Sequence, residues 1–278
     1  MKLYYRISDK SYEKQKLIGA TKKVCLNNFL EVFEEVDTCD IMILCDNCEP
    51  ETIEMVKATG LIFGIGEEGN AGSLRTALGG ALAMCEDDEL VYFCEDDYLH
   101  LPNAPTLLEE GIKRADYVTL YDHPDKYSRF YNGGEHSKVI RTPSSHWRYT
   151  ASTCMTFGVK AKTLREDMET WKKFTSEDHP HDYHIFTELG EKKRRLAVCI
   201  PGAACHTDLT FSGTVNYMTI DPWAVQMMID MIEEELANKV RASALRAGEY
   251  VEIRTSLVGN KTGPERLMAL DAMRQVFK

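Results

Sequence analysis

The sequence has no uninterrupted apolar run that approaches the roughly 20 residues a helix needs to span a bilayer. Its first residues, MKLYYRISDK, lack the basic, apolar and small-residue regions of a secretory signal peptide. Internal repeats, low-complexity tracts and Gly/Ser linkers are also missing. From these absences we expect a cytoplasmic protein without a transmembrane segment.

The chain has too few basic residues to balance its acidic ones. Lysine and arginine total 33 against 44 aspartates and glutamates, which leaves a formal net charge of −11 over 278 residues. Proteins that hold a nucleic-acid backbone use an excess of positive charge, because each phosphate that they neutralise releases counterions. We therefore expect no nucleic-acid partner, and the composition does not favour a DNA-modifying enzyme.

Metal-binding cysteine patterns are scarce, although cysteine itself is not. Nine cysteines are present, and Cys45 and Cys48 form the only C-x-x-C pair. A zinc site needs about four ligands, and no second C-x-x-C completes one. We expect most of these thiols to be reduced and packed as small hydrophobic side chains. A redox or zinc role for Cys45 and Cys48 is the alternative.

The first 120 residues alternate short β-rich runs with helical patterns. The composition, 44% hydrophobic and 28% charged, is that of a globular protein with a sizeable core. Strands that alternate with helices form parallel sheets covered on both faces. The expected fold class is therefore α/β, with a mostly parallel central sheet and helices on both faces. The expected strands cover residues 2–7, 41–45, 61–65, 90–94 and 117–121.

The pattern is less regular after residue 121. A polar stretch rich in Gly, His, Tyr and Arg covers residues 122–150. We expect one domain over residues 1–215 and a helical extension over residues 216–278 packed on it. Regular runs return in the later part of the chain at residues 152–159, 162–174, 182 onward, 196–200 and 223–236.

Polar residues follow three of the expected strands at the point where each strand ends. They are Ser8-Asp9, Asp46-Asn47 and Glu95-Asp96-Asp97. In a parallel α/β sheet, ligands bind at the carboxyl ends of the strands. This coincidence is the first functional signal in the sequence.

The segment VYFCEDDY, residues 91–98, places three acidic residues directly after an apolar strand. Carboxylates this close together repel one another and raise each other's pKa unless a cation neutralises them. Hard oxygen ligands suit Mg²⁺ or Mn²⁺. The strand-end position favours a metal site at Glu95, Asp96 and Asp97 over the alternative, a solvated acidic turn.

With these residues the sequence resembles a known family. The acidic triplet resembles the DxD motif of GT-A glycosyltransferases, which use nucleotide-sugar donors. Asp46 resembles the acidic residue that these enzymes place near the nucleoside base or ribose. The segment GNAGSLRTALGGAL, residues 69–82, resembles the N-x-G … A-R-N-x-G stretch of family 2 members. Asn70, Ser73 and Arg75 stand at matching polar positions.

A later block carries the second half of the resemblance. Residues 181–208, HDYHIFTELGEKKRRLAVCIPGAACHTD, are similar to the family's E-D-x-D-L … P … H block. The resemblance implies that Asp182 takes the acceptor's proton in an inverting reaction, and that His206 helps to hold the metal or the diphosphate. A histidine precedes Asp182 where Glu is usual, and Glu177-Asp178 lies just upstream. Asp178 is therefore the alternative base.

The resemblance covers roughly residues 1–210 and implies a GT-A fold. Residues 1–120 would bind the nucleotide sugar, and residues 121–215 would bind the acceptor. The implied activity is an inverting, metal-dependent transfer of a sugar from a UDP- or GDP-linked donor to a hydroxyl of a carbohydrate or other acceptor. Asp97 and His206 would hold Mn²⁺ or Mg²⁺. The residues expected to contact the donor are Ser8, Asp46, Asn70, Ser73, Arg75, Glu95 and Asp96.

Two other functions stay open. A nucleotidyltransferase that makes nucleotide sugars has this kind of fold, but it would need a Gly-rich, Arg- and Lys-containing phosphate loop after the first strand. Residues 6–19 lack those glycines. A non-catalytic nucleotide-sugar-binding protein would tolerate the loss of Asp97 and Asp182, and both are present. The aromatic and basic loop at residues 127–147 is the candidate platform for the acceptor.

Overall fold

The computed structural model describes residues 1–10, 16–17, 19–127 and 137–208. The chain divides into two units, Met1–Val215 and Asn216–Lys278, and all described residues belong to the first. The helical extension predicted for residues 216–278 lies outside the described residues. So does the middle of the predicted acceptor loop, residues 128–136.

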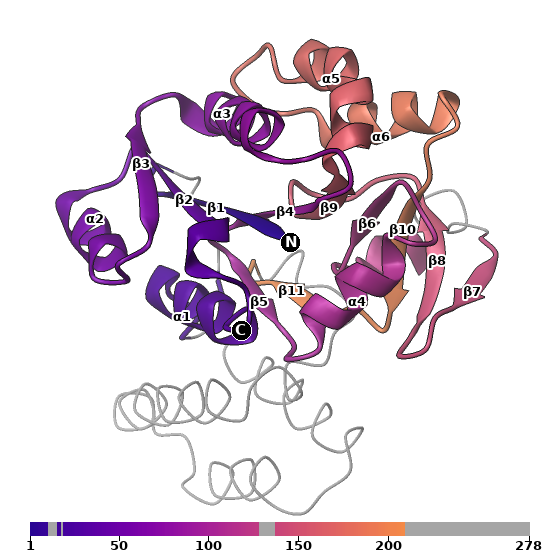
Figure 1. Cartoon of the computed structure of the whole chain (residues 1–278), viewed down its shortest axis with the longest axis horizontal. Helices are drawn as coiled ribbons and strands as arrows, with labels where there is room; N and C mark the ends of the chain where they lie inside the picture. Colours follow the sequence, from indigo (N-terminus) through magenta and orange to yellow (C-terminus); the bar gives the residue numbers. More distant parts are fainter. Residues whose placement is uncertain (11–15, 18, 128–136, 209–278) are drawn as a thin grey trace, which may run out of the picture. The chain divides into compact units, whose positions relative to one another are not determined.

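A nine-stranded mixed sheet runs through the first unit in the order β3-β2-β1-β4-β9-β6-β10-β8-β7 (Figure 1). The strands β3, β2, β1 and β4 are parallel neighbours, and β6 and β10 are also parallel. The strands β9 and β8 run against their neighbours. In sheet order the bounds are Ile62–Gly66, Ile41–Asp46, Lys2–Ser8, Leu90–Glu95, Phe157–Lys160, Tyr117–Thr119, Leu196–Ile200, His146–Thr150 and Val139–Arg141.

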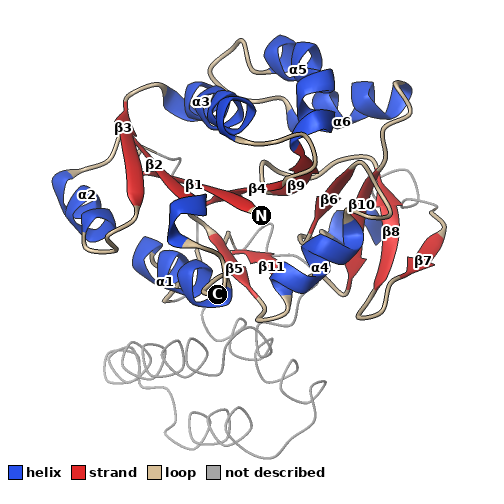
Figure 2. Cartoon of the chain, in the orientation of Figure 1, coloured by secondary structure: helices blue, strands red, loops and turns tan. Residues whose placement is uncertain are grey.

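Helices cover both faces of this sheet (Figure 2). Side chains alternate along a strand, so Leu3, Tyr5 and Ile7 of β1 pack in a cluster with apolar residues of α1, α2 and α4. Tyr4 packs in the other cluster, with residues of α3, α5 and α6. The predicted α/β class with helices on both faces is confirmed. From α1 to α6 the bounds are Lys22–Val32, Pro50–Lys57, Gly69–Met84, Ala104–Gly111, Ala161–Phe174 and Asp182–Glu191.

A short antiparallel pair, β5 (Tyr98–His100) and β11 (Ala204–His206), forms a second sheet. Sequence analysis did not predict this pair, because three-residue strands show no readable alternation. The pair begins directly after the acidic triplet and places His206 opposite Tyr98. The backbone N–H of Thr207 donates to the carbonyl oxygen of Asp97 at 2.7 Å. The pairing therefore brings the late histidine next to the third acidic residue.

Two predicted segments differ from the structure. The run over residues 152–159, which is expected to be regular, joins the sheet only in its second part, because β9 covers Phe157–Lys160. Thr119 Oγ1 hydrogen-bonds Thr153 Oγ1 at 2.9 Å and the carbonyl oxygen of Thr156 at 3.1 Å, so side-chain bonds take the place of a strand ladder there. In the stretch predicted to be irregular, residues 139–141 and 146–150 form β7 and β8.

All nine cysteines are free thiols, and most are buried, as expected. Within the described residues, no group of three or more His, Cys, Asp and Glu side chains is arranged to hold a metal ion. The described residues therefore give no zinc cluster around Cys45 and Cys48. None of the described helices combines the length and the apolar character that crossing a membrane requires.

Candidate functional site

Three parallel strands end at one edge of the sheet, and a cleft opens there. The register pairs Ser8 of β1 with Asp46 of β2, and Arg6 of β1 with Glu95 of β4. The carboxyl ends of these strands thus bring their polar residues together, as the sequence predicts. The cleft has a volume of about 320 Å³, a size in the usual range for small-molecule sites.

This cleft collects most of the predicted site residues. Arg75 and Asp182 do not line it, and His206 meets it through Asp97, one of the lining residues. The predicted residues in its wall are Ser8, Asp46, Asn70, Ser73, Glu95, Asp96, Asp97 and Asp178.

The three acidic residues after β4 have three different partners. Glu95 Oε1 accepts a hydrogen bond from Arg6 Nη2 at 2.6 Å. Asp96 Oδ2 accepts one from the backbone N–H of Ser8 at 3.1 Å. Asp97 Oδ2 lies 3.3 Å from His206 Nε2. The triplet is therefore a set of distinct positions rather than one solvated acidic turn.

Two of these carboxylates are buried side by side. Asp96 is 9% exposed and Asp97 is 6% exposed. Burial, and secondarily the neighbouring charge of Asp97, raise the pKa of Asp96 to about 7. Adjacent buried carboxylates are costly without a cation, because each disfavours ionisation of the other. This part of the cleft is suited to a positive ligand.

Asp97 and His206 fit a hexacoordinate divalent cation. Two ligands at about 2.1–2.2 Å from such an ion and at right angles to each other lie about 3 Å apart. The 3.3 Å between Asp97 Oδ2 and His206 Nε2 is close to that separation. Mg²⁺ is often held by one or two carboxylates, with water and substrate phosphates completing its coordination. A two-residue site is therefore adequate for a cation that arrives with a diphosphate.

Asp46 organises the loop that leads into α3. Its Oδ1 accepts hydrogen bonds from the backbone N–H groups of Glu68 at 2.6 Å and Gly69 at 3.2 Å. Its Oδ2 accepts one from Asn47 Nδ2 at 3.0 Å. Gly69 has a φ of +74°, which favours glycine over residues that carry a Cβ. Asp46 lines the cleft, but its oxygens already hold the loop, so its predicted contact with a base or ribose remains a prediction.

Arg6 is a site residue that sequence analysis did not identify. Its Nη1 donates to the carbonyl oxygen of Asn70 at 2.8 Å and to Ser73 Oγ at 3.1 Å. It lies between Tyr5 and Ile7 in an otherwise apolar strand, and arginine is almost never fully buried unless it is paired. An arginine in the middle of an apolar strand is therefore the feature of the sequence that could have identified Arg6. Lys10, also in the cleft wall, follows the same strand.

Arg75 does not line the cleft. It is exposed on α3, and its Nη1 donates to the carbonyl oxygen of Thr175, between α5 and α6. Its contact with the phosphates of a donor remains a prediction.

The two candidate bases are in different surroundings. Asp178 is exposed and lines the cleft, and its carbonyl oxygen accepts a hydrogen bond from Ala71 N at 3.2 Å. Asp182 is partly buried at the start of α6, where its Oδ1 accepts one from Tyr183 N at 2.6 Å. Burial raises the pKa of Asp182 above its ordinary value.

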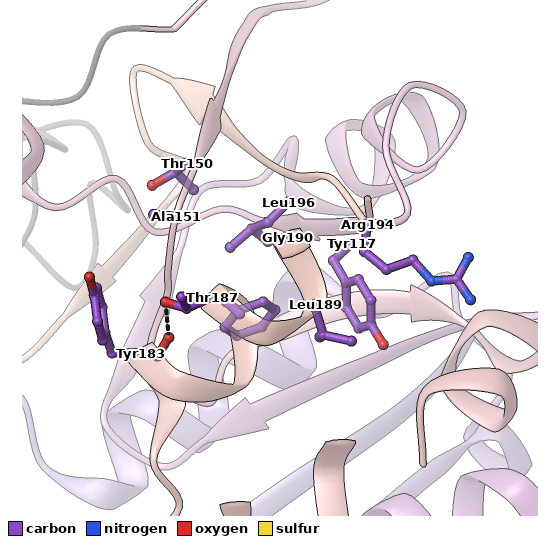
Figure 3. Close-up of a pocket in the computed structure, with 10 residues that line it drawn as sticks. Tyr117, Thr150, Ala151, Tyr183, Thr187, Leu189, Gly190, Arg194 and Leu196 are labelled. Atoms are coloured by element: carbon purple, nitrogen blue, oxygen red, sulfur yellow. Dashed lines mark hydrogen bonds between the residues drawn. The ribbon is translucent and has the colours of Figure 1, made fainter. Parts of the chain in front are cut away.

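A second hollow of about 240 Å³ lies along α6 (Figure 3). Tyr183 and Thr187 line it from α6, and Thr150 lines it from the end of β8. Two of its polar side chains already have partners: Thr187 Oγ1 donates to the carbonyl oxygen of Tyr183 at 2.6 Å, and Arg194 Nε lies 2.9 Å from Asp167 Oδ2. No predicted site residue lines this hollow, so the cleft at the strand ends is the candidate site.

No protein-family model matches the sequence, and no curated protein matches it. Solved structures resemble the chain at low identity. A putative glucose-1-phosphate thymidylyltransferase from Bacillus anthracis is 12% identical with a TM-score of 0.49, over 82% of this chain and 95% of that chain. A 4-diphosphocytidyl-2C-methyl-D-erythritol synthase from Anaerococcus prevotii is 10% identical with a TM-score of 0.43, over 83% and 96%.

The galactosyltransferase LgtC, solved with donor and acceptor sugar analogs, is 9% identical with a TM-score of 0.42, over 71% of this chain and 73% of that chain. A sugar-transferring enzyme and a nucleotide-transferring one thus both occur among these neighbours. The likeness is one of fold alone. At TM-scores below 0.5 it carries no argument about what this chain binds or catalyses.

Proposed function

We propose that this chain is a metal-dependent glycosyltransferase that moves a sugar from a nucleotide-diphosphate donor to an acceptor hydroxyl with inversion. The observation that carries the proposal is the buried Asp97–His206 pair, 3.3 Å apart, at the edge of a cleft lined by Asp46, Asn70 and Ser73. A cation at the pair and a nucleotide in the cleft are adjacent in this arrangement.

In this proposal, Asp97 and His206 hold Mn²⁺ or Mg²⁺, and Asn70 and Ser73 offer polar groups to the nucleotide. When bound, the cation stabilises the negative charge that develops on the departing nucleoside diphosphate. Asp96 fixes the end of β1 by accepting the hydrogen bond from Ser8 N. In this proposal Asn70 and Ser73 orient the donor. Asp96 and Asp97 have different roles, one in holding β1 and the other in holding the cation.

Asp182 is the proposed base that takes the proton from the acceptor hydroxyl. A carboxylate whose pKa is raised by burial is a better proton acceptor near neutral pH than an exposed one. The hydrogen bond from Tyr183 N fixes the orientation of this carboxylate. Asp178, exposed in the cleft wall, is proposed to contact the donor side instead.

A nucleotidyltransferase that forms nucleotide sugars is the second candidate. Arg6 and Lys10, at and after the end of β1, line the cleft, and basic residues there are what such an enzyme needs for its triphosphate. Against it, residues 6–19 lack the glycines of a phosphate loop.

The two candidates release different products. The protein is incubated with Mn²⁺ and UDP-, GDP-, dTDP- or CMP-sugars, and separately with nucleoside triphosphates and sugar 1-phosphates. The proposal predicts slow release of free nucleotide from one nucleotide sugar, stimulated by an acceptor. Pyrophosphate release from a triphosphate, with no turnover of any nucleotide sugar, would favour the second candidate and reject the first.

A further inference from the structure

Arg6 connects two separate walls of the cleft. Nη2 binds Glu95 Oε1 at 2.6 Å, at the end of β4. Nη1 binds the carbonyl oxygen of Asn70 at 2.8 Å, Asn70 Oδ1 at 3.3 Å and Ser73 Oγ at 3.1 Å, all in the first turn of α3. The guanidinium group thus holds the start of a helix and an acidic strand end in fixed relation.

This arrangement is costly for stability, so it calls for an explanation. Arg6 is 5% exposed, and burial of a guanidinium group is costly in general even when the group is paired. Arg6 Nε is buried without a hydrogen-bond partner among the described residues. An apolar residue at this strand position would avoid both costs. A gain in stability therefore does not account for Arg6 at this position.

The charges around Arg6 suggest a functional reason. Glu95, Asp96 and Asp97 bring three carboxylates to the cleft. The Arg6 cation pairs with the first of them, with its Nη2 2.6 Å from Glu95 Oε1, and so ties up that oxygen. Without Arg6, Glu95 would add a negative charge close to the place of the diphosphate and would compete for the metal ion.

We propose that Arg6 is a positioning residue: it holds Glu95 out of metal coordination, leaves the cation to Asp97 and His206, and sets the first turn of α3 for the nucleotide diphosphate. This inference rests on the proposed function, since it assumes that a cation and a diphosphate meet in the cleft. It goes beyond that function because it predicts that Arg6 lowers the affinity for the divalent cation and raises the affinity for the nucleoside diphosphate.

Opposite effects make the test specific. Affinity is measured by calorimetry for Mn²⁺ alone, and for UDP and GDP at saturating Mn²⁺, in wild type and in Arg6→Gln, Arg6→Lys, Glu95→Gln and the double variant Arg6→Gln/Glu95→Gln. Arg148→Gln is the matched control, because Arg148 forms another buried ion pair, 2.7 Å from Asp122, outside the cleft lining. Thermal unfolding of each variant records the change in stability separately.

Arg6→Gln should tighten Mn²⁺ binding about threefold to tenfold and weaken nucleoside-diphosphate binding about tenfold, the scale of one unit charge about 4 Å away that is screened as in bulk water. Glu95→Gln should weaken Mn²⁺ binding by a similar factor, and the double variant should return it to near the wild-type value. Arg6→Lys keeps the charge but not the fork, so it should retain Mn²⁺ affinity and lose diphosphate affinity. Arg148→Gln should lower the unfolding temperature and change neither affinity.

A merely structural Arg6 would give a different pattern. Arg6→Gln would then behave like Arg148→Gln, or would weaken both ligands together, and either result overturns the inference. Should Arg6→Gln fail to fold, Arg6→Lys and Glu95→Gln still decide it, since unchanged Mn²⁺ affinity in Glu95→Gln contradicts the charge argument. If wild type binds Mn²⁺ but no nucleotide, the proposed function fails while the Mn²⁺ series still tests Arg6.

Discussion

At the scale of single residues, the three consecutive acidic residues 95–97 differ in the groups that they contact. Glu95 is bound by a guanidinium, Asp96 by a backbone N–H and Asp97 lies against an imidazole. The sequence alone does not distinguish these three consecutive carboxylates from one another. The distinction makes Asp97 the proposed ligand of the cation, while Glu95 and Asp96 hold Arg6 and the end of β1.

Asp97→Asn should therefore have opposite consequences with and without metal. In metal-free buffer the variant should be more stable than wild type by about 1 kcal/mol, because it removes one of two adjacent buried charges. With Mn²⁺ and a nucleotide diphosphate present, only wild type should gain stability. Thermal unfolding under both conditions checks this. Equal stabilisation of both proteins by Mn²⁺ would show that Asp97 does not hold the ion.

The two candidate bases should separate in turnover. Asp182→Asn should retain donor affinity and lose at least about a hundredfold in kcat, the scale expected for loss of a general base. Asp178→Asn should keep most of its kcat and raise the KM for the donor. Steady-state kinetics on the same donor and acceptor measure both. An active Asp182→Asn beside an inactive Asp178→Asn would move the base to Asp178.

At the scale of elements, the carboxylate of Asp46 fixes the backbone of the loop that leads into α3. Asp46, at the end of β2, accepts hydrogen bonds from two backbone N–H groups of the following loop. Asp46→Ala leaves both donors without this acceptor, so it should lower the free energy of unfolding by about 2–3 kcal/mol. Asp46→Asn keeps one carbonyl acceptor and should cost less. Urea unfolding of the two variants measures the difference, and equal losses would contradict the proposed role of the loop contacts.

The β5–β11 pair should contribute to acid sensitivity through His100. Its backbone exchanges hydrogen bonds with the Asn28 side chain, and its Nε2 lies 2.7 Å from the Tyr92 hydroxyl. Burial lowers the pKa of His100 to about 3, whereas an unfolded histidine has a pKa of about 6.5. Between these values the unfolded chain binds the extra proton, so stability falls as the pH drops from about 6.5.

The slope attributable to this one group approaches about 1.4 kcal/mol per pH unit. His100→Gln should unfold more easily at pH 7.5 but lose less stability than wild type on going to pH 5. Denaturant midpoints across this range provide the measurement. Parallel pH curves for the two proteins would mean that His100 is not the titrating group.

At the scale of the whole molecule, the periodic parts of the fold were predictable and the local contacts were not. The run KLYYRIS is recognisable as a strand because it is apolar on both faces, and its side chains pack alternately in the two hydrophobic clusters. The parallel order of β1, β2 and β4 predicts that Ser8, Asp46 and Glu95 lie close together. The contact between Asp97 and His206 depends on two three-residue strands that leave no periodic trace. The resemblance to GT-A enzymes, rather than any pattern, pointed to that histidine.

Arg6 illustrates the other limit. Its partners come from residues 64 to 89 positions away in the sequence, and no local pattern shows which of the three carboxylates it binds. The reverse holds for Arg75, which matches a motif position but turns toward Thr175 because the side chain follows the packing of α3 beside α5. A motif shows which residues are close in the sequence. Which carboxylate an arginine pairs with depends on how distant strands and helices come together in the fold.

At the same scale, we propose that the cleft binds a nucleotide diphosphate through a divalent cation held by Asp97 and His206. Calorimetric titration of UDP and GDP into wild type, Asp97→Asn and His206→Gln, each with Mn²⁺ and with EDTA, tests it most directly. We expect binding to wild type that requires Mn²⁺ and is weakened at least about tenfold in both variants. Equally tight binding in EDTA, or in both variants, would contradict it.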